Sequence, residues 1–224
     1  MTVTVPLPTS TTSTVSSVCK ALTILEMLAC ADGQAIGVTD LAQVADMPKS
    51  TTHRLLKDME EHGFIGRVGS KYRIGNRCLQ LGAVARWSAY GRLVEKAAPA
   101  IEWLFERTGE TVHLAVLDGT DALYLEKVTG RGGCLLRTKV GMAVPAHTTA
   151  VGRALLSSAP VVGADVVQPE FVGVAAPVRL LGDGSVIAAL SVDGAAARIN
   201  AELLAPAVRE AATRTARRLG LHVS

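Results

Sequence analysis

The stretch DMPKSTTHRLLKDMEEHGFIGRVGSKYRIG, from Asp46 to Gly75, carries basic residues early and acidic residues late in its first half. Its apolar residues recur at helical spacing, which predicts a helix that starts at Pro48 and runs to about His62. Gly63 follows as a typical residue after a helix end. Two short β-capable runs then flank the dipeptide at 69–70, which predicts a tight hairpin.

The predicted helix has two chemically different faces. At 100° per residue, an apolar stripe is formed by Thr52, Leu55, Leu56 and Met59. The opposite face carries Ser50, His53, Arg54 and Lys57, flanked by Lys49 and Thr51. Donors near the N-terminal end of a helix suit base edges and phosphates in a major groove, while carboxylates at the far end stay away from the DNA backbone. The face is therefore typical of a DNA recognition helix.

The neighbouring segments support this interpretation. A helix is expected from Val18 to Cys30, and a second, short helix with Thr39 as its cap comes before the turn into the third. The hairpin after the third helix would form a wing, whose basic residues Arg67, Lys71 and Arg73 could bind adjacent phosphates or reach a minor groove. Taken alone, a basic helix and a hairpin are more often a solvated face. The order of the three helices and the basic wing favours a winged helix-turn-helix at residues 18–75.

The 224 residues contain enough apolar side chains for a hydrophobic core, and their net positive charge is compatible with a polyanionic partner. Hydrophobic residues make up 49%, and the net charge is +3. The four cysteines are far apart, which argues against a zinc site or a disulfide framework and fits a reducing cytoplasm. The sequence shows no apolar run long enough to span a membrane. Residues 1–17 are rich in Thr and Ser and are expected to form a disordered arm rather than a secretory signal.

The rest of the chain predicts a linker helix and a second domain. Residues 76–109 are mostly helical, with Gly91 and Pro99 as potential breaks, which indicates a linker helix at 76–90 and the start of a second domain at 91–224. Strands are expected at 111–119, 121–128, 133–140, 170–180 and 184–194, and helices at 147–159 and 200–223. Strands with helices outside them predict a compact α/β domain, so that the fold class of the whole chain is α+β.

Five segments resemble the IclR family of bacterial transcription regulators, in the family's order. The segment VTDLAQVADMPKSTTHRLLKDMEEHGFI (38–65) is similar to its winged helix-turn-helix, and YRIGNRCLQLG (72–82) to the end of the wing and the start of the linker. The segments VPAHTTAVGRALLS (144–157), AAPV (175–178) and ALSVDG (189–194) resemble pieces of its effector domain. The resemblance implies a metabolite-responsive regulator that binds near-palindromic operators as a homodimer or homotetramer.

The resemblance also implies an effector site. In relatives the C-terminal domain has a GAF-like fold and binds a small, often acidic or aromatic metabolite. Carried over to this chain, Ala150, Val151, Ser191 and Asp193 would line the pocket. Asp193 departs from the small polar residue that is frequent in relatives, and its negative charge would disfavour an anionic effector unless it is paired.

A second departure is the length of the segment 157–178. Relatives place several tens of residues between the helix of GRALL and the AAPV strand, including a Cys and an acid of the pocket, whereas here the interval is little more than a loop. The effector domain is thus expected to be shortened internally. The pocket could be open, altered or non-functional on this reasoning.

No catalytic constellation was recognised in the sequence. His113 and His147 have no carboxylate or nucleophile partner at a recognisable spacing, and the acidic pair at 60–61 lies on a helix exterior. We therefore expect no enzyme, no cofactor and no metal site. The rival hypothesis is a small-molecule-binding or enzymatic α/β domain whose N-terminal module makes protein contacts. The operator, the effector and the sign of regulation cannot be deduced from the sequence.

Overall fold

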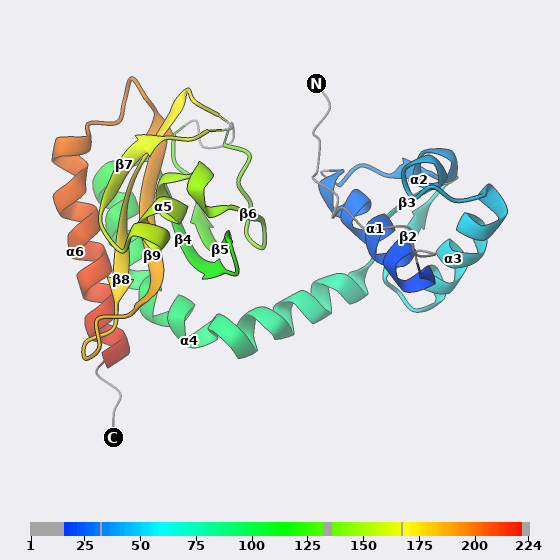
Figure 1. The fold of residues 1–224 in the computed structure, drawn as a ribbon, viewed down its shortest axis with the longest axis horizontal. Coiled ribbons are helices and arrows are strands. Elements are labelled where there is room, and N and C mark those ends of the chain that lie inside the picture. Colours follow the sequence, from blue (N-terminus) through cyan, green and yellow to red (C-terminus); the bar gives the residue numbers. More distant parts are fainter. Residues whose placement is uncertain (1–15, 32, 132–135, 167, 221–224) are drawn as a thin grey trace. The chain divides into compact units, whose positions relative to one another are not determined.

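The computed structural model describes residues 16–31, 33–131, 136–166 and 168–220 (Figure 1). It divides into two compact units, Met1–Ala85 and Arg86–Ser224. Most of the predicted N-terminal arm lies outside the described residues. Of its last two residues, Ser16 caps the first helix by accepting a hydrogen bond from the backbone N–H of Cys19, and Ser17 begins that helix.

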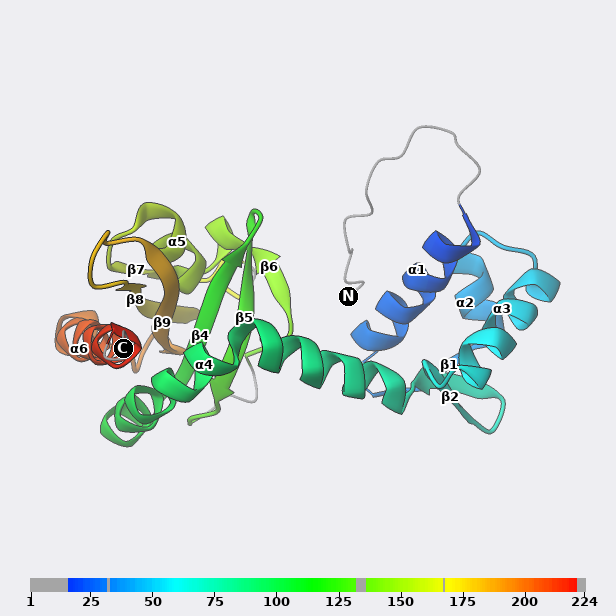
Figure 2. The same cartoon turned by 90° about the horizontal axis from the view of Figure 1, so that it is seen from below.

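Within its described residues, the first unit contains three complete helices, the start of a fourth and a small antiparallel sheet (Figure 2). Its elements are α1 (Ser17–Cys30), β1 (Ile36–Gly37), α2 (Val38–Val44), α3 (Lys49–Glu61), β2 (Ile65–Val68) and β3 (Lys71–Ile74). The strands lie in the order β1-β3-β2, and Val68 pairs with Lys71 across the two-residue turn of the hairpin. Helix α3 and the hairpin follow the prediction, whereas β1 was not expected.

One apolar cluster holds the first unit together. Its buried members are Ile24, Leu28, Leu41, Met47, Leu56, Met59, Ile65 and Tyr72. Helices α1, α2 and α3 and both long strands contribute, because each has an apolar stripe that must be removed from water. The stripe predicted for α3 packs here, with Leu55 only partly buried.

Two helix starts differ slightly from the expectation. Helix α2 begins at Val38, so that Thr39 lies inside it, and the capping position belongs to Gly37 in an extended conformation with no side-chain cap. The pairing of β1 with β3 fixes Gly37 as the last strand residue, which makes the helix start earlier. Pro48 is the residue before α3 rather than its first residue.

Helix α4 is continuous from Asn76 to Thr108. The predicted linker helix and the first helix of the second domain are therefore one element, and neither Gly91 nor Pro99 interrupts it. Trp87 packs within 3.1 Å of the position that a side chain at Gly91 would take, and the buried residues beyond Pro99 anchor the helix on the core of the second unit. Tertiary packing thus overrides the local preference for a break.

The second unit is built on a six-stranded antiparallel sheet in the order β6-β5-β4-β9-β8-β7. Its strands are β4 (Thr111–Asp118), β5 (Asp121–Val128), β6 (Ala143–Pro145), β7 (Val161–Ala164), β8 (Phe171–Arg179) and β9 (Val186–Ala195). Its helices are η2 (Ala146–Thr148, a 3₁₀ turn), α5 (Ala150–Ser157) and α6 (Ala201–Gly220), together with the second half of α4.

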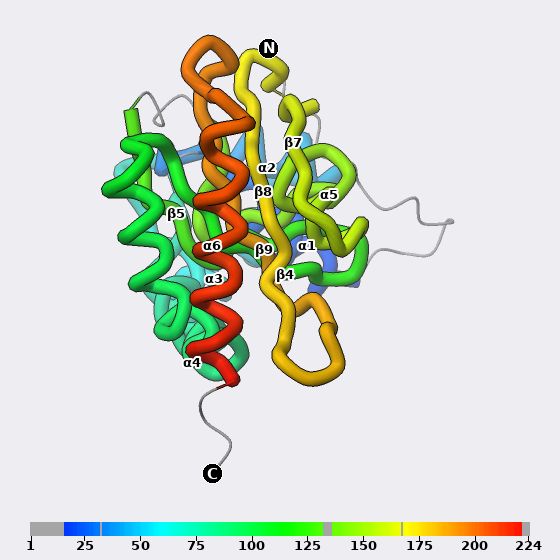
Figure 3. The backbone as a smooth tube through the Cα atoms, turned by 90° about the vertical axis from the view of Figure 1, so that its left-hand side faces the viewer, coloured from blue at the N-terminus to red at the C-terminus, as the bar shows by residue number. Residues whose placement is uncertain are grey.

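The two faces of this sheet carry different layers. On one face, α6 and the second half of α4 lie side by side and bury the larger apolar residues of the strands, such as Leu114 and Leu190 (Figure 3). On the other face, α5 packs on smaller residues, among them Ala115, Ala175 and Ala189. Side chains alternate along a strand, so consecutive residues of β9 contribute to opposite layers.

Two predictions for the second unit need correction. The described part of the expected strand at 133–140, residues 136–140, forms no strand, and the edge position beside β5 is taken by β6 instead. The interval after α5 is more than a loop, because it contains β7, which pairs with β8 from Val161 to Ala164. The run VVGA is too short and too rich in small residues to stand out as a strand.

Candidate nucleic-acid interface and effector site

Helix α3 presents its predicted polar face to solvent. Lys49, Ser50, His53, Arg54 and Lys57 are exposed, and Thr51 is half-buried. The helix ends where Gly63 takes a positive φ of 75°, and the N–H groups of residues 63 and 64 return to the carbonyls of residues 60 and 59. This capping motif closes the helix after the acids and leads the chain directly into the wing.

Most of the charge on this face is available to a partner. Within the described residues, the structure assigns no protein partner to the side chains of Lys49 and Arg54. Lys57 approaches Glu61 at 3.7 Å, but both side chains are more than half exposed, so the ion pair is weak and open to competition by phosphate. Glu61 therefore partly neutralises the charge of Lys57 but not that of Arg54.

The wing carries the other three predicted basic residues on exposed positions. Lys71 and Arg73 lie on β3, and Arg67 lies on β2. Arg67 donates from Nε to the carbonyl of Gly69 at 3.0 Å, and its guanidinium lies 5.8 Å from the ring centre of Tyr72. It is thus partly engaged in holding the hairpin turn, whereas Lys71 and Arg73 extend from a strand that is anchored by buried Tyr72.

The four predicted effector residues come together on the α5 face of the second sheet. Ser191 and Asp193 lie on β9, where alternation places both on this face, and Ala150 and Val151 begin α5 above it. Ala150 and Val151 are both buried in the packing of α5. Thr149 caps the helix and accepts a hydrogen bond from the N–H of Gly152.

Asp193 is paired, and its partners were not predicted. Its Oδ2 atom accepts hydrogen bonds from Nδ1 of His113 at 2.9 Å and from the hydroxyl of Ser191 at 2.5 Å. Nε2 of His113 lies 2.8 Å from the hydroxyl of Thr138. The sequence-based view that His113 has no carboxylate partner is therefore wrong, because β4 and β9 are neighbours and His113 lies opposite Ser191.

Tyr124 completes this buried polar group. Its ring lies 5.0 Å from that of His113, and its hydroxyl is hydrogen-bonded to Thr149. Burial raises the pKa of Tyr124 well above its ordinary value, and the negative charge of Asp193 raises it further. The hydrogen bond with Thr149 lowers it, and the more weakly acting charge of Asp165 raises it. The tyrosine therefore stays protonated, close to negatively charged carboxylates. Tyr124 and Ala122 are two positions apart on β5 and therefore share a face of the sheet, and this spacing could have been read from the sequence.

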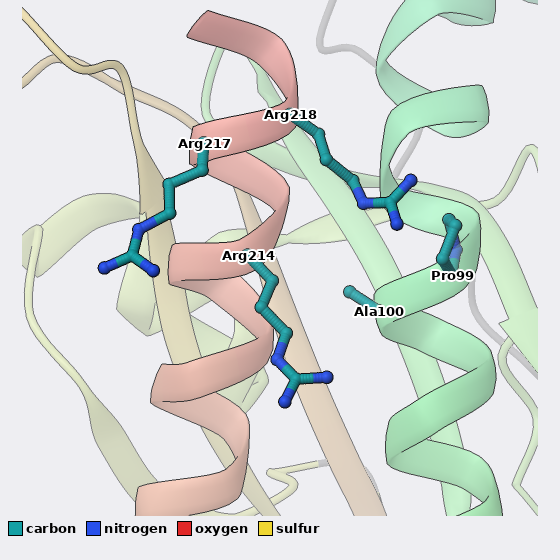
Figure 4. Close-up of a pocket in the computed structure, with 5 residues that line it drawn as sticks. All are labelled: Pro99, Ala100, Arg214, Arg217 and Arg218. Atoms are coloured by element: carbon teal, nitrogen blue, oxygen red, sulfur yellow. The ribbon is translucent and has the colours of Figure 1, made fainter. Parts of the chain in front are cut away.

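Two surface recesses lie away from this group. One, of about 230 Å³, lies between α4 and α6 and is lined by Pro99, Ala100 and three arginines of α6. Figure 4 shows Arg218 extending toward α4 and Arg217 extending the other way, so the guanidinium groups do not converge. Arg214 is held by Glu210 at 2.6 Å. The other, of about 380 Å³, lies between the end of α3, the wing and the start of α4.

Comparison with known proteins identifies the family. The model described as IclR helix-turn-helix domain matches residues 17–69, and the one described as Bacterial transcriptional regulator IclR C-terminal matches residues 90–166. The chain belongs to the IclR family. Its fold class is α+β, with a winged helix-turn-helix in the first unit, as predicted. The second match ends at residue 166, between β7 and β8.

Relatives in this family agree with the assignment. The chain is 34% identical to HTH-type transcriptional regulator XynR of Escherichia coli over 147 residues, which are 64% of this chain and 56% of that protein. It is 34% identical to Transcriptional repressor IclR of the same organism over 150 residues, 65% and 54% of the two chains. The matches thus span about half the length of these curated relatives.

Solved structures show the same fold over nearly the whole chain. An IclR homolog from Microbacterium hydrocarbonoxydans, solved in complex with 4-hydroxybenzoate, has 25% identity and a TM-score of 0.76, covering 91% of this chain and 99% of that one. The IclR of Thermotoga maritima has 21% identity and a TM-score of 0.73, covering 91% and 98%.

Two findings concern the wider function classes. No group of three or more His, Cys, Asp or Glu side chains within the described residues could hold a metal ion. Across the same residues, no helix is both long and apolar enough to cross a membrane.

Proposed function

We propose that this chain is a sequence-specific DNA-binding transcription regulator, acting in the cytoplasm on double-stranded operator DNA, and not an enzyme. The observation that carries the proposal is the exposed, basic and hydroxyl-rich N-terminal part of α3, presented by a winged helix-turn-helix of the IclR family. The named relatives, a transcriptional regulator and a transcriptional repressor, support the same activity.

The residues of the first unit would divide the work of recognition. Lys49, Ser50, Thr51, His53 and Arg54 lie in the first two turns of α3 and would enter the major groove. Lys57 and the wing residues Lys71 and Arg73 would neutralise phosphates, with Arg67 beside them. The carboxylates of Asp58 and Glu61 lie toward the far end of the helix, where DNA repulsion would be smallest.

A homo-oligomer, either a dimer or a tetramer, would present two such heads to a near-palindromic operator. The first half of α4 supports a second copy as the partner. Leu79, Leu81, Val84 and Trp87 are all exposed on it, and Leu79 and Trp87 are 74% exposed each. Apolar side chains of this size on a solvated helix mark an interaction surface. Leu79→Glu should shift sedimentation toward the monomer; an unchanged sedimentation coefficient would remove α4 from the interface.

The second unit would bind a small metabolite that alters DNA binding. The complex of a relative with 4-hydroxybenzoate, an aromatic acid, supports an effector of similar size. Ala150, Val151, Ser191 and Asp193 are the residues that we assign to this site. A coupling of about 1–3 kcal/mol between the two sites is typical of such regulators.

The decisive experiment measures operator binding as a function of salt. A regulator should prefer one upstream sequence, and its affinity should fall steeply with salt, with a log–log slope of about −0.9 per neutralised phosphate. Arg54→Ala should weaken specific binding by about 1–3 kcal/mol if the side chain contacts a base edge. Lys71→Ala should lower the salt slope by about one while leaving sequence preference intact.

Glu61→Ala is the matched control, because it changes an exposed charge on the same helix without removing a donor. Its effect on specific binding should be small. If Arg54→Ala and Glu61→Ala weakened binding equally, the opposite face of α3 would be the one that meets DNA. If wild-type protein bound no sequence above the non-specific level, the regulator assignment would be wrong. The rival hypothesis of a small-molecule-binding or enzymatic α/β domain would then be favoured.

A further inference from the structure

The carboxylate of Asp193 lies at the centre of the proposed effector site. It projects from β9 on the face that α5 covers, and its side chain is only 17% exposed. Its position is further defined by Gly173 on the neighbouring strand β8. A side chain at Gly173 would overlap both Oδ1 of Asp193 and Cβ of Ala150, so the carboxylate lies between β8 and the first residue of α5.

Three side-chain donors near Asp193 are already directed at Asp193 or at the backbone. His113 and Ser191, both fully buried, donate to Oδ2 of Asp193. Lys127, opposite His113 on β5, donates from Nζ to the carbonyls of Leu136 and Thr138 at 3.0 and 2.7 Å. Buried donors of this kind must be satisfied, and in this chain an internal acid satisfies two of them.

The charge balance of the site points the same way. The carboxylates of Asp193 and, more weakly, Asp165 raise the pKa of Tyr124, so both place negative charge within reach of its hydroxyl. A ligand carboxylate at this place would meet like charge in a poorly solvated environment, where such repulsion is strong. It would also find the hydrogen bonds from His113 and Ser191 already taken.

We propose that Asp193 fills, with its own carboxylate, the anion position of the effector site, so that this chain selects against acidic effectors. The ligand class that remains is a molecule without an acidic group, whose hydroxyl, amide or amine can donate a hydrogen bond to Asp193. The inference rests on the proposed function, since it specifies the effector class of that same site, and it makes Asp193 the specificity-determining residue.

The test compares ligand binding by full-length wild type and Asp193→Ser in calorimetry, with sodium 4-hydroxybenzoate as the probe. The substitution removes the charge, opens space, and frees His113 and Ser191 to donate to the ligand. Asp193→Ser should bind the acid at least about tenfold more tightly than wild type, which corresponds to roughly 1.4 kcal/mol. Asp118→Ser, at an exposed end of β4, removes the same charge elsewhere and should behave like wild type.

A second ligand separates charge from space. For 4-hydroxybenzamide, which has the same shape without the charge, Asp193→Ser should gain less affinity than for the acid. Equal gains for the two ligands would mean that only space had changed and would overturn the charge selection. No gain for the acid, including the case in which neither protein binds it, would overturn the proposal as a whole.

Asp193→Asn keeps the test decisive if the serine variant does not fold. It preserves the shape and an acceptor for His113 while removing the charge, so it should bind the acid more tightly than wild type, though with a smaller gain than serine. A folded Asn variant that binds the acid no more tightly than wild type would refute the proposal. Operator binding, measured on the same wild-type sample, reports separately on the proposed function, because the calorimetric comparison needs no DNA.

Discussion

Replacing Leu56 with alanine tests whether helix α3 depends on the apolar cluster of the first unit. Leu56 is completely buried in the apolar cluster of the first unit, on the side of α3 opposite Arg54. Truncating a buried leucine to alanine costs about 2.7–5 kcal/mol, from lost transfer free energy and from the cavity left behind. A unit of roughly 60 residues has about 3–9 kcal/mol of stability in total. The substitution should therefore remove much or all of it.

The two tryptophans make the assay selective. Trp87 and Trp103 are the only ones in the chain, and both belong to the second unit. Thermal unfolding of Leu56→Ala, followed by the circular-dichroism signal of helices, should show an additional transition at lower temperature. The transition seen by tryptophan fluorescence should stay at the wild-type temperature. Operator binding should be lost in the same variant, since a melted α3 presents no ordered face.

Leu22→Ala is the matched control, because Leu22 is 53% exposed on α1 of the same unit. It should change stability by no more than about 0.5 kcal/mol. The reasoning is refuted if tryptophan emission and circular dichroism shift together in Leu56→Ala, which would mean one shared cooperative core, or if Leu22→Ala is as damaging as Leu56→Ala.

Two further predictions concern single positions. Gly63→Ala should destabilise the first unit by about 1 kcal/mol in denaturant unfolding, because φ is positive there although an added Cβ would only come into ordinary contact with Arg77. Gly82→Ala inside α4 should be neutral or stabilising, and similar losses at the two positions would refute the backbone argument. Since the pKa of Tyr124 is raised in the folded state, the folded chain keeps a proton that the unfolded chain loses near pH 10, so stability should be retained below about pH 10 and fall as pH rises above it. Tyr124→Phe should show a smaller fall in urea unfolding over that range, and an identical fall in both proteins would contradict the assignment.

Much of the first unit could be predicted because its signals are local. The 3.6-residue period identified the buried stripe of α3, the glycine at 63 marked its end, and the dipeptide at 69–70 marked the hairpin turn. Each of these depends on residues within one or two turns of each other in sequence. Where the prediction failed there, at the start of α2, the cause was non-local, since pairing with β3 set the end of β1.

The second unit shows where local reasoning stops. Strands β4, β5, β8 and β9 follow from alternation and apolar runs, but β6 and β7 are short edge strands that are stabilised by pairing with a longer neighbour. Neither has enough residues for a periodic signal of its own.

The sequence by itself determined the family, the recognition helix with its wing, and the identity of the residues on the exposed face of α3. Only the tertiary structure decided that Asp193 is paired, since His113 lies 80 positions away along the chain and reaches it through the register of β4 with β9. A strand's own period tells which residues share a face, but which strand becomes its neighbour is settled by how the whole sheet buries its apolar side. That is why the exposed residues of α3 could be identified from sequence, and the hydrogen bond between His113 and Asp193 could not.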